Sequence, residues 1–362
     1  MTTTVTGERG KAISSGLPRS RAVRRVDRAA LILLPTLITL LALVTIANLA
    51  FGAVHIGPDQ VIRILAGLEA AGSPEATVLT AIRLPRVVLA ALVGAALATS
   101  GAALQGVFRN PLADPGLIGV SSGAAAGAAF AIVTGVATFG AASTGVAAFA
   151  GGLAAAGIGY LAARHQGRTE VVTLILTGVA VSAIAAAIVG VFTYLADDNQ
   201  LRTLIFWTMG SLGTATWSGV ASIAPLVLAA IVLLPLFGSP LNALVLGERE
   251  ARHLGFHPER IRLGVITLAA LGTGAAVSLT GIIGFVGLVV PHLIRLIAGP
   301  DHRLLLPASA IGGAALLLAA DLIARTAVAP AEMPVGVVTA LIGGPFFLFL
   351  LIRTRKTQGG WS

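Results

Sequence analysis

One segment rich in charged side chains, Leu241 to Arg262, interrupts the long apolar part of this sequence. Seven Asp, Glu, Lys and Arg residues lie between Glu248 and Arg262, although such residues make up only 11% of the chain. Apolar positions recur among them, and breaks at Gly255 and Pro258 predict two short helices joined by a turn. These side chains can bind a partner protein through salt bridges and hydrogen bonds. The alternative is a solvated amphipathic linker on a membrane surface.

Two further groups of charge lie outside this segment. Arg83 and Arg86 are three residues apart, which places them on one side of the first turn of a predicted helix. A guanidinium binds carboxylates through paired hydrogen bonds, so exposed arginines here would bind acidic groups of an outside partner, or simply anchor the helix end. Asp321 and Arg325 are four residues apart, and we expect them to pair as a structural unit. Arg325 is expected to face outwards.

Residues for catalysis or metal binding are missing from the pattern. The chain has no cysteine, so thiolate chemistry is excluded. It also has no GxxxxGK[ST] phosphate loop, since its Gly10-Lys11 pair is followed by Ala12. His292 is a lone histidine in a predicted helix and is more simply a packed side chain than a ligand. We therefore expect no enzymatic activity, no catalytic residue and no bound metal or cofactor.

The elements that carry these residues are predicted to be membrane helices, because mean hydropathy is +0.94 and hydrophobic residues make up 56% of the chain. Long apolar runs without strand-like alternation indicate an all-α polytopic membrane protein. Glycines 119, 123 and 127 recur every four residues, which indicates close helix packing. The 200–217 stretch is expected to dip partly into the membrane. Ten complete spans are predicted: 29–51, 84–107, 116–136, 143–163, 171–195, 218–237, 263–283, 284–299, 304–325 and 334–352.

The placement of basic residues predicts the orientation of these spans. With the N-terminus inside, all but five of the 24 Lys and Arg residues fall on the cytoplasmic side, as the positive-inside rule requires. The five on the outside are Arg63, Arg83, Arg86, Arg202 and Arg325. Both termini are then cytoplasmic, with a disordered basic tail over 1–28, a transmembrane domain over 29–352 and a second tail over 353–362. This distribution argues against nucleic acid as a partner.

A rigid turn is predicted at the cytoplasmic end of the second span. Asn110-Pro111 and Asp114-Pro115 enclose it, and each proline fixes its own φ and biases the preceding residue away from helix. Such a turn could seal the inner end of a pore or be purely structural. Phe192 and Tyr194, near the outer end of the fifth span, are equally compatible with an apolar vestibule and with lipid contact.

Several long blocks resemble one family, the permeases of bacterial importers for iron siderophores, haem and cobalamin. They are RLPRVVLAALVGAALATSGAALQGVFRNPLADPGLIGVSSGAAAGA, LNALVLGEREARHLG, GFVGLVVPHLIRLIAGPDHRLLLPASAIGGA and ADLIARTAVAPAEMPVGVVTALIGGPFFLFLL. Two segments, PLADPGLIGVSSGAA and VAPAEMPVGVVTALIGGPFFL, are most similar to haem permeases. The resemblance covers the chain from about Arg83 to its end.

The resemblance implies a homodimer in the inner membrane, with a central pathway lined by the fifth helix. It also implies two copies of a separate ABC ATPase that uses ATP inside, and a periplasmic binding protein outside. Docking of the binding protein is carried over to Arg83, Arg86 and Arg325, and a cytoplasmic gate to Asn110 and Leu112. Thr169 and Glu170 correspond to a second gating element, although this region departs from the family pattern. Contact with the ATPase is carried over to Leu246, Gly247, Glu248, Glu250, Ala251, Arg252, Leu254 and Gly255.

The function predicted from the sequence is that of the membrane subunit of an ATP-driven importer, with haem as transported substrate and alternating access as its mechanism. An iron-siderophore or cobalamin is the alternative cargo. An ion-coupled secondary transporter is the alternative class, but it would require more buried acids than Asp321 alone.

Overall fold

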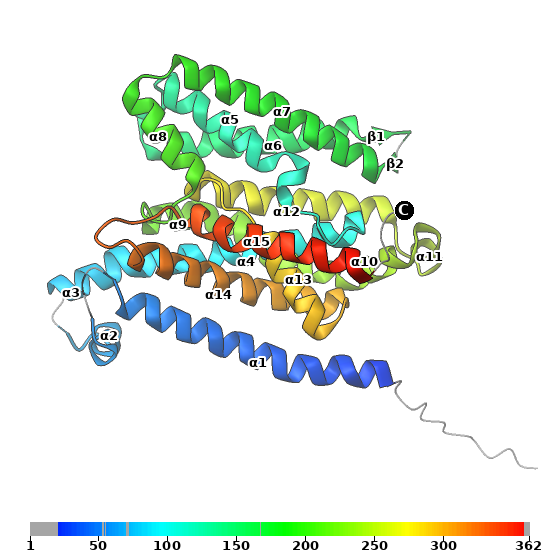
Figure 1. The fold of residues 1–362 in the computed structure, drawn as a ribbon, viewed down its shortest axis with the longest axis horizontal. Coiled ribbons are helices and arrows are strands. Elements are labelled where there is room, and N and C mark those ends of the chain that lie inside the picture. The colour runs from blue at the N-terminus through cyan, green and yellow to red at the C-terminus, as the bar shows by residue number, and fades with distance from the viewer. Residues whose placement is uncertain (1–20, 53, 55, 70–71, 167, 358–362) are drawn as a thin grey trace, which may run out of the picture.

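The protein is a bundle of long helices that run roughly parallel to one axis (Figure 1). The computed structural model describes residues 21–52, 54, 56–69, 72–166 and 168–357. Within these, seven helices are long and apolar enough to cross a membrane, and three shorter apolar helices accompany them, over Val120–Val133, Val286–Ala298 and Val335–Leu350. These ten segments correspond one to one to the ten predicted spans, and Val171–Leu195 has the predicted bounds.

The first half of the chain consists of eight α-helices and a small hairpin. The helices are α1 (Arg21–Ala50), α2 (Pro58–Leu65), α3 (Pro74–Thr77), α4 (Leu84–Phe108), α5 (Val120–Val133), α6 (Ala141–Ala162), α7 (Val171–Leu195) and α8 (Asp198–Met209). A π-helical turn over Val78–Arg83 joins α3 to α4, and 3-10 turns cover Pro115–Ile118 and Val136–Phe139. Strands β1 (Arg164–His165) and β2 (Arg168–Thr169) pair antiparallel just before α7.

The second half contains α9 (Trp217–Leu233), a 3-10 turn (Leu234–Phe237), α10 (Gly238–Leu246), α11 (Glu248–His253), α12 (Pro258–Thr280), α13 (Val286–Ala298), α14 (His302–Thr326) and α15 (Val335–Thr357). The short helices α10 and α11 meet at Gly247, whose φ of 142° suits glycine. Two short helices are present, as expected for the charged segment, but they meet at Gly247, and the breaks at Gly255 and Pro258 separate α11 from the long helix α12.

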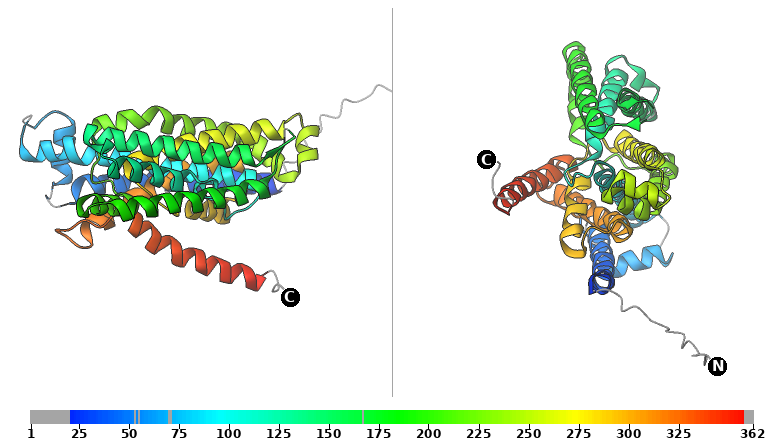
Figure 2. Two further views of the ribbon diagram at one scale, coloured as in Figure 1. Left: turned by 90° about the horizontal axis from the view of Figure 1, so that it is seen from above. Right: turned by 90° about the vertical axis from the view of Figure 1, so that its right-hand side faces the viewer.

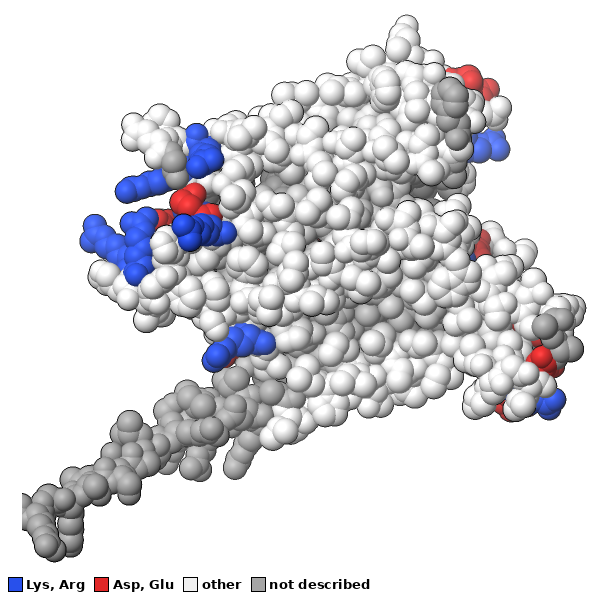
Figure 3. Space-filling model, turned by 180° about the vertical axis from the view of Figure 1, so that it is seen from behind, with Lys and Arg blue, Asp and Glu red and all other residues white. Residues whose placement is uncertain are grey.

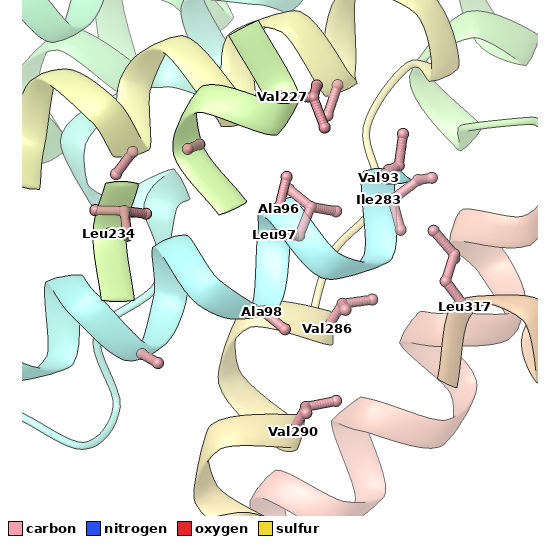
Figure 4. Packing of buried hydrophobic residues seen from close by; sticks show 14 of the residues in the cluster. Val93, Ala96, Leu97, Ala98, Val227, Leu234, Ile283, Val286, Val290 and Leu317 are labelled. Atoms are coloured by element: carbon pink, nitrogen blue, oxygen red, sulfur yellow. The ribbon is translucent and has the colours of Figure 1, made fainter. Parts of the chain in front are cut away.

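Helix α4 lies at the centre of the bundle, and almost all of its residues are buried. Figure 4 shows its Val93 and Leu97 among apolar side chains of α9, α13 and α14. Glycines permit the close approach: a Cβ added at Gly94 or Gly101 would meet a backbone oxygen of α14 or α13. The predicted glycine packing is also confirmed, because Gly123 and Gly127 of α5 lie against the α6 backbone.

The two ends of the bundle differ in charge. Lys and Arg gather at the end that carries α11 and the β-hairpin, and few lie at the opposite end (Figure 3). Helix α1 begins and α15 ends at the arginine-rich end (Figure 1). This distribution follows the positive-inside pattern, so the α11 end is the cytoplasmic end.

Several boundaries differ from the prediction. Residues 21–28 and 353–357 are helical rather than tails, because α1 and α15 extend past their apolar parts; residues 1–20 and 358–362 lie outside the described residues. Of the 200–217 stretch, residues 200–209 belong to α8, which a capping box between Asp197 and Gln200 begins, and Trp217 begins α9. Helix α15 leans away from the bundle toward its C-terminal end (Figure 2).

Candidate functional site

The outer end contains a buried ion cluster centred on Asp321 of α14. Arg86 of α4 donates to this carboxylate through Nε (3.1 Å to each oxygen) and Nη2 (2.9 Å to Oδ1). Arg325 lies one turn further along α14, with its Nε 3.3 Å from Oδ2. The Asp321 side chain is 0% exposed. The predicted pairing of Asp321 with Arg325 is present, and Arg86 is the stronger partner that the sequence did not reveal.

The other two arginines predicted to dock a partner, Arg83 and Arg325, attach to the last turn of α1 and to the residues after it. Arg83 donates to the backbone oxygens of Leu49, Ala50 and Val54. Arg325 donates through Nη2 to the side chain of Asn48 (2.7 Å). The carbonyls that end a helix lack partners within it, so arginines that reach them satisfy α1 and fix it against α4 and α14.

The expectation that these arginines are exposed is wrong. Arg83 and Arg86 are buried, and the Arg325 side chain is only 7% exposed. The physical reason is that internal acceptors from α1, α14 and the loop after α14 occupy their donors. The exposed member of the cluster is Glu332, 50% exposed, whose Oε2 accepts a hydrogen bond from Arg86 Nη1 (2.8 Å). A docking role for the three arginines stays a prediction.

At the cytoplasmic end, side chains fix the turn between α4 and α5. Asn110 Oδ1 accepts from the backbone N–H of Leu112 (3.0 Å). Asp114 Oδ1 accepts from that of Gly116 (2.8 Å) and so caps the 3-10 turn at Pro115. Burial raises the pKa of Asp114. The turn is therefore a rigid structure, which is what its two prolines predict.

Gln105 ties this turn to α13, a contact that sequence reasoning missed. Its Nε2 donates to the backbone oxygens of Ala113 and Gly287, both at 3.2 Å. Its Oε1 accepts from Arg295 Nη2 (2.9 Å). The available signal was a single glutamine in a helix of small apolar residues, because a buried amide requires partners. The candidate gate is thus attached to two helices of the bundle.

The residues predicted to contact an ATPase form a surface of mixed exposure at the same end. Ala251 is buried and holds α11 to the bundle, whereas Gly247 and Glu248 are half-buried. The exposed members are Leu246, Glu250, Arg252, Leu254 and Gly255. Exposed leucines beside charged groups suit a protein partner in water.

The remaining candidates are placed apart from one another. Thr169 is buried at the end of β2, and Glu170 is the N-cap residue of α7. The ring of His292 lies edge-on to Phe346, with centroids 6.1 Å apart. Among the described residues, no three His, Cys, Asp or Glu side chains form a group that could hold a metal ion. Phe192 contacts Phe130, whereas Tyr194 is exposed.

Residues 40–353 match the model of the FecCD transport family. This chain belongs to the FecCD transport family. The match covers all the groups described above, from α1 to α15.

Curated relatives and a solved structure agree with this assignment. The hemin transport system permease of Yersinia pestis is 50% identical over 77% of this chain and 84% of its own length. The cobalamin import system permease of Halobacterium salinarum is 46% identical over 79% of this chain and 77% of its own length. A metal-chelate type ABC transporter solved in an inward-facing conformation has a TM-score of 0.79 and 33% identity, covering 89% of this chain and 99% of that one.

As a FecCD permease, the chain is the multi-pass membrane subunit of an ABC importer for haem, cobalamin or a siderophore, in the bacterial inner membrane. Permeases of this family are not enzymes, and they work with an ATPase and a binding protein. The expected family, fold class, location and absence of catalysis are confirmed. The ion-coupled alternative is set aside.

Proposed function

We propose that this permease imports haem, with cargo released into the membrane pathway by a periplasmic haem-binding protein. The observation that carries this proposal is the 50% identity to the hemin permease of Yersinia pestis over most of both chains. A cobalamin permease at 46% identity supports the second candidate, cobalamin. Haem and cobalamin differ in polarity, so the polarity of the surface that lines the pathway helps to distinguish between them.

The face of α7 that the bundle leaves uncovered supports haem. This helix contains no charged residue, and Val172, Leu176 and Val179 are among its exposed side chains. Its other face packs on the α4–α5 turn, where a Cβ at Gly178 would meet the Leu117 oxygen. A pathway lined by such a face suits the planar, largely apolar body of a porphyrin. It offers few partners for the many amide groups of cobalamin.

We propose further that the working assembly is a homodimer with two ATPase copies. Helix α15 leans away from the bundle (Figure 2), and Leu341, Leu348 and Phe349 on it are exposed. These side chains are available to a second copy of the chain, while the α11 surface is available to the ATPase.

The binding protein is proposed to dock over the outer ion cluster. Glu332 pairs with Arg86 from the solvent side. A carboxylate of the binding protein would replace Glu332 as the partner of Arg86. At the opposite end, Asn110 and Leu112 are proposed to close the pathway, because the rigid turn that holds them packs against α7. No cofactor is proposed to stay bound to this chain; haem passes through it and ATP is used by the partner.

The test is ATP-dependent uptake into liposomes that contain the permease, its ATPase and its binding protein. Haem, cobalamin and a ferric siderophore are compared at equal concentration. We expect haem uptake that stops when the ATPase is replaced by a variant unable to hydrolyse ATP. Uptake of cobalamin or of the siderophore without haem uptake would reject the haem assignment and leave the importer assignment intact.

A further inference from the structure

A continuous series of polar contacts joins α11 to the beginning of α7. Arg262 of α12 donates through Nη2 to Glu248 of α11 and through Nη1 to Glu259 (2.8 Å). The second oxygen of Glu259, Oε2, accepts a hydrogen bond from the backbone N–H of Thr169 (3.1 Å). Thr169 ends β2, and α7 begins two residues later at Val171. Three elements that are separate in the sequence therefore meet through two side chains of α12.

The burial of these groups favours a firm connection. The Arg262 side chain is 5% exposed, and its partners Glu248 and Glu259 are 38% and 29% exposed. A guanidinium can hold two carboxylates at fixed angles because its donors form a planar fork. The hydrogen bond from Arg262 lowers the pKa of Glu248, so this carboxylate is charged at neutral pH.

The elements at the two ends of the series have few other attachments. Helix α11 is six residues long, and Ala251 is its buried residue. The hairpin has two residue pairs, Arg164 with Thr169 and His165 with Arg168. Such short elements cannot keep a fixed position through their own hydrogen bonds. Their positions relative to each other therefore depend on Glu259 and Arg262.

Movement of the hairpin would displace the candidate gate, the turn that holds Asn110 and Leu112. Helix α7 packs on the 3-10 turn after Asp114 through Gly178, and Ser182 of α7 bonds Ser122 of α5 (3.1 Å). The 3-10 turn directly follows the turn that holds Asn110 and Leu112. A shift of the first turn of α7 thus has a packed route to that turn.

We propose that Glu259 and Arg262 are the positioning residues that transmit a displacement of α11 to α7, and so connect the ATPase contact to the pathway. This inference rests on the proposed function, because the displacing partner is the ATPase. A purely structural role would stabilise α11 on α12 without making the position of α7 depend on nucleotide.

The absence of native cysteine allows a direct test with one label. Val172 is exposed in the first turn of α7, and Val172→Cys carries a nitroxide whose mobility reports the position of that turn. The labelled permease is assembled with its ATPase in nanodiscs, and spectra are compared with and without ATP, using a hydrolysis-dead ATPase to hold the ATP-bound state. We expect a clear ATP-dependent change in the parent complex.

The variants separate transmission from folding. In Glu259→Ala and Arg262→Ala we expect the ATP-dependent change at position 172 to disappear and uptake to fall by about tenfold or more. Complex formation and ATP hydrolysis should stay within about twofold of the parent. Arg164→Gln is the matched control, since it removes an exposed arginine of the same hairpin and leaves the series intact. Arg262→Lys keeps the charge without the fork and should restore only part of the response.

The inference is overturned if the label at position 172 does not respond to ATP in the parent complex, or still responds in Glu259→Ala and Arg262→Ala. A response in the parent that these variants lose supports it, whichever cargo is carried. If the response is present but haem is not taken up, the haem assignment fails while the transmission stands.

Discussion

The two ends of this permease use arginine in different ways. At the outer end, Arg86 surrounds a fully buried carboxylate, Asp321, and joins long helices that are already packed together. At the cytoplasmic end, Arg262 joins two half-exposed carboxylates, and one of these belongs to the six-residue α11. The outer cluster therefore fixes a rigid body, while the inner one sets the position of short elements that a partner can displace.

This difference in burial predicts how much stability the protein loses when each cluster is mutated. A buried charge that loses its partner stays in a poorly solvated place, so the loss is large. A half-exposed carboxylate that loses its partner is rescued by water, so the loss is small. Stability should respond mainly to the outer cluster, and coupling to ATP mainly to the inner one.

The largest effect is expected for Asp321→Asn. Removing this charge leaves Arg86 and Arg325 buried beside each other with insufficient compensation, and we expect a loss of about 3–5 kcal/mol. Thermal unfolding of the purified permease in detergent measures it. Glu75→Gln, which removes a carboxylate at the same end outside the cluster, is the control. An unchanged transition in Asp321→Asn would mean that the outer cluster does not stabilise the bundle.

A smaller loss is expected for Arg262→Ala, about 1–2 kcal/mol, because its two partners can turn to water. Arg252 also approaches Glu248, at 3.5 Å, but is 47% exposed, so Arg252→Ala should change stability by less than about 0.5 kcal/mol. The same unfolding measurement compares them. Equal losses in both variants would show that burial of Arg262 adds nothing to the pair.

The sequence predicts the helices of this protein better than it predicts the contacts between side chains. The bounds of α7 are visible because an apolar run ends on both sides at charged or polar residues, and each long span follows from hydropathy in the same way. The spans 263–283 and 284–299 were predicted to meet without a loop, whereas residues 281–285 lie outside any helix. There Phe285 adopts a φ of 66° before α13 begins, and Gly281 lies against the Trp207 oxygen. Nothing in the local sequence shows that another segment approaches there.

The burial of Arg83, Arg86 and Arg325 could not be predicted for a related reason. Their positions at helix ends indicate an interface, but their exposure depends on acceptors 29 to 277 residues away in the chain. The same holds for Glu259, whose partner Thr169 is 90 residues away. Local pattern gives the element that carries a side chain, whereas tertiary packing decides what that side chain contacts.

Glu332→Gln separates the two possible uses of the outer cluster. If Glu332 pairs with Arg86 in the place that a carboxylate of the binding protein would take, removing the charge of Glu332 should tighten docking by about three- to tenfold. Surface plasmon resonance with the permease in nanodiscs measures the dissociation constant, and Glu75→Gln again controls for net charge. Weaker docking in Glu332→Gln would instead make Glu332 a direct contact of the binding protein.

The smallest effect is expected from pH at Glu248. Because its pKa in the folded protein lies below the ordinary value of 4.5, chiefly through the bond from Arg262, its contribution is present above that value and is lost as the pH falls through the lowered pKa. The contribution should be less than about 1 kcal/mol, since Glu248 is partly exposed and Arg252 and Arg109 also act on it. Hydrogen exchange of the α11 amides should therefore be steady from neutral pH to the ordinary carboxyl range and then lose protection. Glu248→Gln should lack this step, and an identical profile in both proteins would show that the Glu248–Arg262 bond does not hold α11.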